Sequence, residues 1–405
     1  MPNTQLQNRV VRTLASAQVL NGVGVAGTVA AGSLLVSSIT DSETLAGLAQ
    51  TSAVLGAAAL ALPLARLTAQ GGRRLALSVG YSSGVVGSIF AIIGGAHRNL
   101  FFMLLGTFLV GAASAAGYQA RFAAIDLATK ETRAKQLSFV VWGSTIGAVA
   151  GPNLMDPSGN LAELFNLPRL VGPYLVSAAT LFFAMLVIQI FLRPDPYLTA
   201  EKQANVVQHK GSTKAALSHI RSNPKALFAI SAIAIGHVAM VSVMVMTPIH
   251  MKHVDVSLRI IGFVISVHVL GMYAFSPIVG ALSDRLGRVR VIQIGLVILL
   301  ASTVVAGLAA ADNAVQLGIG LFLLGLGWSC TLIAGSAFLS ESVSLEMRPA
   351  SQGASDLVMN LSGAGGGAIA GVIIGTLSYG WLCLFAAIPV ILLSVLSRRV
   401  NGNAD

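Results

Sequence analysis

Charged side chains are scarce in this sequence. Only 10% of its 405 residues are Asp, Glu, Lys or Arg, against about 25% in ordinary soluble domains, and 55% are hydrophobic. The mean hydropathy of +0.80 excludes an ordinary water-soluble domain and indicates a chain whose main solvent is lipid. The alternating segments of about ten residues that a membrane β-barrel requires are also missing. The chain is therefore expected to cross the membrane as helices.

Cysteine and the common catalytic motifs are equally scarce. The two cysteines, Cys330 and Cys383, fall in different predicted spans, which excludes a disulfide framework. The sequence contains no GxxxxGK[ST] phosphate loop, no HExxH zinc helix and no GxSxG nucleophile elbow. These absences argue against an enzyme and against a pump that hydrolyses ATP itself. We predict a protein that is not an enzyme and holds no cofactor.

Apolar segments of roughly 20 residues, the length that crosses a hydrocarbon core about 30 Å thick, recur along the chain. We predict twelve of them, near 14–38, 44–66, 74–96, 99–122, 134–153, 170–192, 225–249, 259–282, 290–311, 314–338, 350–376 and 379–397. The 43 glycines suit helices that pack closely in a bilayer through small residues. The predicted fold is an all-α membrane protein with twelve transmembrane helices.

The net charge of +10 would also be compatible with a nucleic-acid-binding protein, so the placement of the basic residues decides between the two. With the N-terminus inside, all but four of the 25 basic residues fall in cytoplasmic segments. The exceptions are Arg98, Arg169, Lys252 and Arg259. This distribution obeys the positive-inside rule and requires no nucleic acid. It predicts a multi-pass membrane protein with both termini in the cytoplasm. We also expect a monomer, and the family resemblance described below implies a location in the bacterial cytoplasmic (inner) membrane.

The second half of the chain repeats the first at an offset of 215 residues. The offset aligns Gly72 and Arg73 with Gly287 and Arg288, Asp126 with Glu341, Glu131 with Glu346, and Arg133 with Arg348. The longest polar stretch separates the halves. We therefore predict two six-helix bundles, residues 1–192 and 224–405, joined by a cytoplasmic linker at 193–223.

Residues 280–290, with the sequence GALSDRLGRVR, resemble the signature loop of the major facilitator superfamily. The resemblance implies two pseudo-symmetric bundles with a substrate site between them and transport by alternating access. Acid and base next to a glycine turn can latch helix ends in one state and release them in the other. The predicted latch residues are Asp284, Arg285, Gly287 and Arg288.

The equivalent turn of the first half keeps Gly72 and Arg73 but has Ala69 and Gln70 where an acid and an arginine are expected. The latch is therefore predicted to be asymmetric. Span five also carries glycines four residues apart, at Gly143, Gly147 and Gly151. We interpret these glycines as close helix packing.

Span seven contains Met240 and Met244, and span eight contains His268 and Met272. Residues four apart share a helix face, and His237 falls on the same stripe as Met240. At 1.5 Å per residue, Met240 and His268 both lie about 15 Å from the outer ends of their spans. We predict that the two spans are antiparallel neighbours, so that three thioethers and an imidazole converge near the membrane centre. Soft, uncharged thioethers favour Cu(I) as the cargo, although methionine also serves as an ordinary core filler.

The same four residues, in their Met-x-x-x-Met and His-x-x-x-Met motifs and at their separation, resemble the paired signature of the CcoA-like copper importers, a branch of the superfamily. The resemblance implies copper uptake across the cytoplasmic membrane, in relatives for the assembly of haem-copper cytochrome oxidase. By match to the motif, the copper-handling residues would be Met240, Met244, His268 and Met272. Similar transporters of this branch carry riboflavin. The alternatives are therefore transport of an organic solute such as riboflavin or a drug, and a membrane receptor that senses metal without moving it.

Further candidates lie at the end of span seven and in span eleven. His250, Met251 and His253 cluster near the outer end of span seven, where they would either collect metal or belong to an ordinary polar loop. Asp356 is the one acid placed inside a span. An intramembrane carboxylate is a default functional candidate. Asp356 could carry a coupling proton, balance the charge of Cu(I), or pair with a basic residue of the cytoplasmic network.

Overall fold

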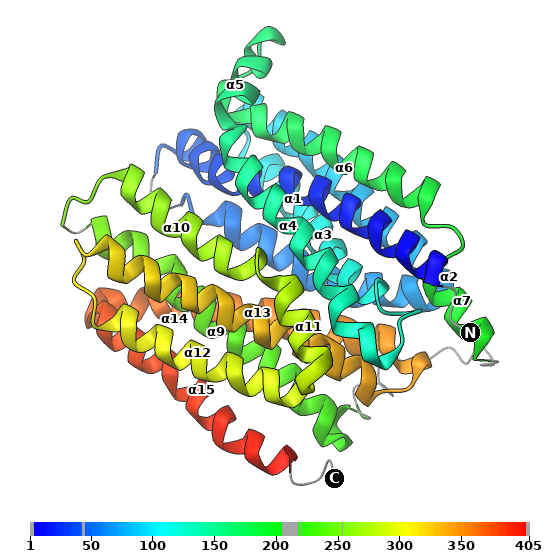
Figure 1. The fold of residues 1–405 in the computed structure, drawn as a ribbon. Coiled ribbons are helices and arrows are strands. Elements are labelled where there is room, and N and C mark those ends of the chain that lie inside the picture. The colour runs from blue at the N-terminus through cyan, green and yellow to red at the C-terminus, as the bar shows by residue number, and fades with distance from the viewer. Residues whose placement is uncertain (1–3, 43–44, 205–217, 219, 253, 402–405) are drawn as a thin grey trace. The chain divides into compact units, whose positions relative to one another are not determined.

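The computed structural model describes residues 4–42, 45–204, 218, 220–252 and 254–401. Within these residues every regular element is a helix and no strand occurs (Figure 1). The predicted all-α class is therefore confirmed. Short polar caps begin several of the helices: the side chain of Asn99, for example, accepts a hydrogen bond from Phe102 N at 3.1 Å.

The described part of the first half is built from six long or medium helices and two short 3₁₀ turns. They are α1 (Thr4–Thr40), α2 (Leu48–Ala96), α3 (Leu100–Ala123), η1 (Lys130–Thr132), α4 (Arg133–Asn153), α5 (Met155–Leu164), η2 (Arg169–Val171) and α6 (Gly172–Phe191). A further short helix, α7 (Pro196–Gln203), lies in the predicted linker. Its N-cap is Asp195, whose side chain accepts hydrogen bonds from the first backbone N–H groups of α7.

The second half repeats this plan, again with helices separated by short turns. Its elements are α9 (Pro224–Lys252), α10 (Leu258–Tyr273), α11 (Ser276–Leu286), α12 (Arg288–Gly307), α13 (Ala314–Ser342), η3 (Leu345–Met347), α14 (Arg348–Thr376) and α15 (Tyr379–Asn401). The helices α10 and α11 together form one candidate span, from Arg259 to Leu286.

Ten helices in the described part of the chain are long and apolar enough to cross a membrane, and the pair α4 and α5, bent by 62°, makes up to eleven. The helix α2 has 49 residues, which corresponds to about 74 Å and is more than twice the thickness of a hydrocarbon core. It is broken at Gly72, whose φ of 82° and ψ of 178° are not helical. Because α2 therefore contains two of the predicted spans, each of the twelve predicted segments overlaps one of these candidate spans. The predicted segment 259–282 is divided between α10 and α11, and the segment 290–311 extends past the end of α12 at Gly307.

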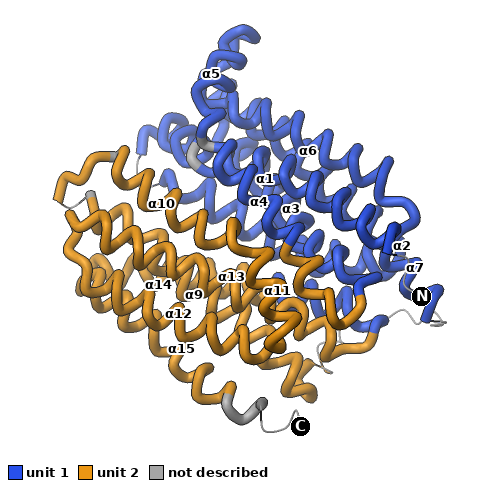
Figure 2. Tube along the Cα trace, viewed as in Figure 1, with its two compact units in different colours: residues 1–128, 139–216, 345–357 blue, residues 129–138, 217–344, 358–405 orange. Residues whose placement is uncertain are grey.

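The helices group into two compact units (Figure 2). Unit 1 contains residues 1–128, 139–216 and 345–357, and unit 2 contains residues 129–138, 217–344 and 358–405. Two short segments thus join the unit of the other chain half: the beginning of α4 belongs to unit 2, and the beginning of α14 belongs to unit 1.

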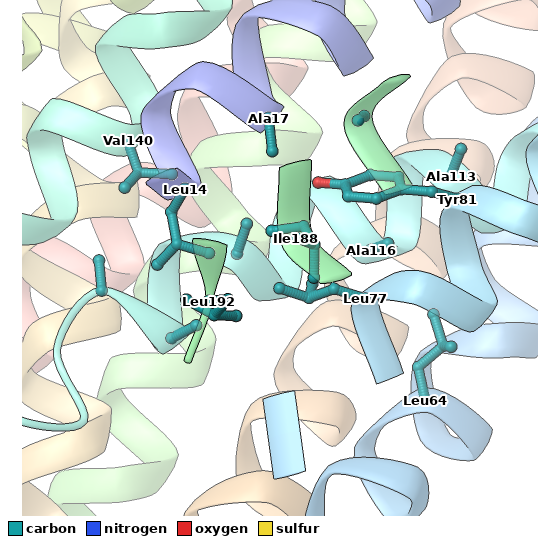
Figure 3. Packing of buried hydrophobic residues seen from close by; sticks show 14 of the residues in the cluster. Leu14, Ala17, Leu64, Leu77, Tyr81, Ala113, Ala116, Val140, Ile188 and Leu192 are labelled. Carbon is teal, nitrogen blue, oxygen red and sulfur yellow. The ribbon is translucent and has the colours of Figure 1, made fainter. Parts of the chain in front are cut away.

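Small residues let the helices of unit 1 approach closely. Its buried core contains many alanines together with larger side chains such as Leu14, Leu77 and Ile188 (Figure 3). A Cβ added at Gly147 of α4 would lie 2.4 Å from the backbone of Gly22 in α1, so only glycine fits there. Close packing of this kind holds membrane helices together, since lipid provides no hydrophobic drive between them. The packing interpretation of the span-five glycines is confirmed at Gly147.

In unit 2 the helix α13 is the central element. It packs along α9, α10 and α12, whereas α9 and α10 touch each other only slightly. Figure 1 shows α13 running beside α9, α10 and α12. The position of α13 decides which side chains of α9 and α10 can share a site.

Candidate functional sites

His268 lies in α10 with its imidazole completely buried against α13. Its Nδ1 is 2.8 Å from the carbonyl oxygen of Leu321. A carbonyl can only accept a hydrogen bond, so Nδ1 carries the proton and Nε2 carries a lone pair. Among the described residues Nε2 has no hydrogen-bond partner. Buried polar atoms are rarely left unpaired, so the Nε2 lone pair marks a candidate ligand position.

Met272 follows His268 by one helical turn and is also buried. The two residues lie where α10 approaches α13 closely. A Cβ added at Gly325 would be 2.5 Å from the carbonyl oxygen of His268 and 2.7 Å from the nitrogen of Met272. The glycine of α13 therefore lets the two backbones touch. The pair His268 and Met272 forms one small set of soft and borderline donors at this interface.

The predicted packing of spans seven and eight as antiparallel neighbours needs correction. Met240 of α9 is buried and Met244 is half-buried, but α9 and α10 both pack along α13 and make little contact with each other. His237 contacts the same helix, since its Nδ1 accepts a hydrogen bond from Trp328 Nε1 at 3.1 Å. The glycines of α13 allow this arrangement because they bring both neighbours onto one helix.

Trp328 gives the relative depth of the two motifs. On one side it bonds to His237 of α9, and on the other its ring meets Tyr273 of α10 at 5.7 Å in a T-shaped contact. His268 lies five residues, or about 7.5 Å, beyond Tyr273 toward the other end of α10. On α9, Met240 and Met244 lie three and seven residues beyond His237 in the same direction, about 4.5 and 10.5 Å. The depth of His268 thus falls between the depths of the two methionines.

The described residues contain no group of three or more His, Cys, Asp or Glu side chains placed to hold a metal ion. The methionines near His268 are therefore the further donors that the copper prediction requires.

The residues at the end of α9 are packed and not part of an open loop. The His250 ring stacks on Tyr379 of α15 at 4.3 Å, and Met251 is completely buried. The hydroxyl of Tyr379 lies 2.7 Å from Thr247 Oγ1, which ties α15 to the same turn of α9. His253 lies outside the described residues. His250 and Met251 are therefore held by helix packing.

Asp356 pairs with Arg121 of α3 inside unit 1. Arg121 Nη2 is 2.6 Å from Asp356 Oδ1, and the two side chains are 2% and 1% exposed. The guanidinium also donates to the carbonyl oxygen of Tyr118 at 2.8 Å and lies 4.5 Å from the centre of the Phe122 ring. Three roles were left open for Asp356. In this structure Asp356 pairs with a basic residue.

The turn at residues 280–290, called the second-half turn below, forms a dense charged cluster within unit 2. Arg288 donates to Glu341 at 2.9 Å, to Asp284 at 2.5 Å and to the carbonyl oxygen of Lys130 at 2.6 Å. The oxygens of Asp284 accept hydrogen bonds from the backbone nitrogens of Ala134 and Lys135, at 3.0 and 2.8 Å. A carboxylate at the start of α4 is favoured by the helix dipole.

Two further residues of the predicted latch differ from Asp284 and Arg288. Gly287 has a φ of 95°, which favours glycine, and the side chain of Arg285 is exposed. Of the four predicted latch residues, Asp284 and Arg288 therefore make the cluster and Gly287 makes the turn.

The turn at Gly72 and Arg73, called the first-half turn below, lies within unit 1 and has different contacts from the second-half turn. Arg73 forms two hydrogen bonds to Asp126, at 2.8 and 3.1 Å, and a third to Gln352 of α14 at 2.7 Å. Burial raises the pKa of the Asp126 carboxyl, and the guanidinium of Arg73 opposes that rise. The repeat aligned these four residues, and the structure shows that in each half the arginine pairs with the acid 53 residues later, Arg73 with Asp126 and Arg288 with Glu341.

Sequence reasoning missed two residues of these clusters. Arg121 was counted with the cytoplasmic basic residues, although it lies near the end of an apolar span and pairs with the intramembrane acid. Asp195 was counted only as part of the linker, although its carboxylate accepts a hydrogen bond from Arg74 N at 2.7 Å. The sequence did contain a signal for each residue: Arg121 lies inside a predicted span, and Asp195 lies between two prolines.

Comparison with known proteins decides the family. The family model described as "Major Facilitator Superfamily" matches residues 14–257 and 238–401. The chain belongs to the major facilitator superfamily. This MFS protein is 36% identical over 391 residues to the "Uncharacterized MFS-type transporter YdeG" of Bacillus subtilis (strain 168), covering 96% of this chain and 91% of the relative. The predicted superfamily membership is confirmed.

Two other similar proteins bear on function and fold. The "Riboflavin transporter RfnT" of Brucella anthropi is 28% identical over 305 residues, or 75% of this MFS chain and 74% of RfnT. The fucose:proton symporter FucP of E. coli superposes with a TM-score of 0.73 at 14% identity, covering 96% of this chain and 98% of FucP, which shows a common fold. These names include riboflavin and fucose and do not include copper, so they lend no support to the resemblance to copper importers.

Proposed function

We propose that this MFS protein is a secondary transporter that imports copper, as Cu(I), across the bacterial cytoplasmic membrane by alternating access. The observation that carries the proposal is the buried His268 imidazole, with Nδ1 bonded to a backbone carbonyl and Nε2 unpaired one turn from Met272. In this proposal the protein acts as a monomer, performs no catalysis and needs no resident cofactor, and both termini lie in the cytoplasm.

The donor chemistry supports Cu(I) over harder ions. Metal-binding histidines commonly donate their second ring N–H to a carbonyl, which fixes the tautomer and the ring orientation. His268 has this arrangement with Leu321. Thioethers are soft and uncharged, so Met272 adds affinity for Cu(I) while magnesium, calcium and manganese find no oxygen donors in the motif. A set without thiolates or carboxylates also suits a carrier, because the ion must leave again.

The methionines of α9 have a supporting role in this proposal. Counted from Trp328 at about 1.5 Å per residue, the depth of His268 falls between the depths of Met240 and Met244, and both α9 and α10 pack along α13. The two helices hardly touch, so a single compact cage is not required. An ion can instead pass from thioether to thioether at similar depth. His237 is engaged with Trp328, and His250 and Met251 lie nearer the outer end, where they would receive the ion first.

Uptake of radiolabelled copper under reducing conditions tests the proposal. Cells that produce His268→Ala or Met272→Leu should accumulate copper at least about tenfold more slowly than wild type, as expected from losing metal ligands. Met272→Leu keeps the side-chain volume and removes the sulfur. The matched controls are His97→Ala, at an exposed position, and Met103→Leu, in the core of unit 1. Wild-type uptake in both site variants would refute the site, and binding without accumulation would indicate a receptor.

A second candidate is import of an organic solute such as riboflavin, which the similarity to RfnT favours. Amide side chains within unit 1 supply a polar surface for such a cargo. Buried carbonyl oxygens of Gln18 and Asn21 have no hydrogen-bond partner among the described residues, and Gly117 of α3 faces both. Uptake of radiolabelled riboflavin in the same cells discriminates between the cargoes. Flavin accumulation that is insensitive to His268→Ala, together with copper uptake no faster than in cells without the protein, would replace the first proposal.

We further propose that the ion pair of Arg121 and Asp356 couples transport to protons. Separating two buried charges is costly, so α14 can leave α3 readily only when the carboxylate is neutralised. The variant Asp356→Asn mimics the protonated acid. It should lose proton-driven accumulation while retaining exchange of labelled for unlabelled cargo, and the exposed Asp312→Asn should retain both. Full accumulation by Asp356→Asn would contradict the coupling role.

A further inference from the structure

The first-half turn lacks the acid that its second-half counterpart supplies from within the turn. Asp284 stands four residues before Arg288 and caps the start of α4, but Ala69 and Gln70 occupy the corresponding stretch before Arg73. A carboxylate nevertheless reaches the first-half turn. It comes from Asp195, which precedes α7 and lies 121 residues away in the chain from Arg74.

The Asp195 carboxylate joins two helix starts. One oxygen accepts hydrogen bonds from the nitrogens of Tyr197 and Leu198, at 3.0 and 3.2 Å, and so caps α7. The other accepts a hydrogen bond from Arg74 N at 2.7 Å, where α2 resumes after its break. Both helix starts present positive dipole ends, which favour a negative charge between them.

The contact is built to fit a carboxylate. A Cβ added at Gly72 would lie 2.5 Å from the Asp195 carboxyl carbon, so any larger residue at position 72 would force the Asp195 side chain to move. At the corresponding Gly287 an added Cβ would meet nothing within 4 Å. Gly72 therefore serves both the turn and the Asp195 contact.

The next residue in the chain connects this contact to α14. Arg73 follows Gly72 and precedes Arg74, and its guanidinium lies 5.8 Å from the centre of the Tyr197 ring. Its side chain is 1% exposed and donates to both Asp126 and Gln352. The guanidinium of Arg73 therefore contacts both the Tyr197 ring of α7 and Gln352 of α14.

We propose that Asp195 is a positioning residue: its carboxylate fastens the linker helix α7 to the turn at Gly72 and thereby holds Arg73 in the orientation that binds Gln352 of α14. The linker thus helps to hold the beginning of α14 against the other helices of unit 1. This role is independent of which solute the protein carries.

The test measures how often the beginning of α14 separates from its neighbours. Ser351 is completely buried next to Gln352, so Ser351→Cys is a reporter that a maleimide labels only after opening. In purified protein in nanodiscs, Asp195→Asn should raise the labelling rate about tenfold, the change expected for losing one charge-assisted hydrogen bond. Asparagine can still cap α7 with its one oxygen, but its amide nitrogen cannot accept from Arg74. Protein without Ser351→Cys gives the background from Cys330 and Cys383, which are buried.

A double-mutant cycle separates positioning from general loosening. If Asp195 acts through Arg73 and Gln352, Asp195→Asn should add little to the labelling rate of Gln352→Ala, so the two effects should be strongly non-additive. The exposed Asp312→Asn should change nothing. If Asp195→Asn fails to fold, Asp195→Ser serves instead, since serine caps helices but is too short to reach Arg74. Wild-type labelling in a folded Asp195 variant, or additive effects in the cycle, would overturn the proposal.

Discussion

The first-half and second-half turns share one sequence pattern but hold their arginines with different partners. In both, a glycine with positive φ is followed by an arginine that pairs with the acid 53 residues later. In the second-half turn, Asp284 adds its own carboxylate and caps α4. In the first-half turn, the linker supplies Asp195, and the contact with α14 is made by Gln352.

This difference shows that the two turns place different numbers of charged groups around their arginines. The pair of Arg73 and Asp126 is nearly inaccessible, with side chains 1% and 0% exposed, whereas Glu341 is 18% exposed and has Arg133 3.6 Å away as a second cation. The first-half turn depends on one enclosed arginine. The second-half turn shares its charge among several groups, so losing one of them should matter less.

The largest difference is expected between Arg73→Ala and Arg288→Ala. Removing Arg73 leaves the Asp126 charge buried and should lower the free energy of unfolding by about 3–5 kcal/mol. Removing Arg288 leaves Glu341 beside Arg133 and should cost about 1–3 kcal/mol. Thermal unfolding of the purified proteins in the same detergent measures both. An equal or larger loss in Arg288→Ala would break the comparison.

The next effect concerns the two glycines. Both Gly72 and Gly287 adopt backbone conformations that cost other residues about 1–3 kcal/mol. In Gly72→Ala the new methyl also meets the Asp195 carboxylate, whereas in Gly287→Ala it meets open space. We therefore expect Gly72→Ala to lower the unfolding temperature more than Gly287→Ala. Equal shifts would show that backbone strain alone explains both positions.

A smaller and more local effect is expected for Asp284→Asn. Each oxygen of Asp284 accepts one backbone N–H at the start of α4, and asparagine can satisfy only one of them. Losing such a bond costs about 1–2 kcal/mol, so amide hydrogen exchange in residues 133–138 should accelerate roughly tenfold. Unchanged exchange in this peptide would mean that Asp284 does not hold α4.

The smallest effect is expected for Arg285→Ala. Arg285 belongs to the sequence motif but is exposed, so its removal should change the free energy of unfolding by less than about 0.5 kcal/mol. The same variant is the matched control for Asp284→Asn. A substantial loss of stability or transport in Arg285→Ala would show that the second-half turn uses Arg285 in another conformation.

The repeat identified residues of both turns without predicting which of them pair. An offset of 215 residues aligned Arg73 with Arg288 and Asp126 with Glu341, and both pairs form. The partner of Asp356 could not be predicted in this way. No acid lies one helical turn from Arg121 in the sequence, so nothing near Arg121 indicated that it forms an ion pair. Asp195 was hidden for a similar reason, since its hydrogen bond to Arg74 joins positions 121 residues apart.

The sequence by itself determined the all-helical membrane fold, the superfamily and the twelve apolar segments, because hydrophobic length and a repeated motif are local properties of a chain. Only the tertiary structure decided that α13 separates most of α9 from α10, and that Asp356 faces Arg121. The physical reason is that small residues let almost any pair of membrane helices pack closely. Which helices pack together depends on how well their whole surfaces fit, and the sequence of a single helix does not reveal that fit.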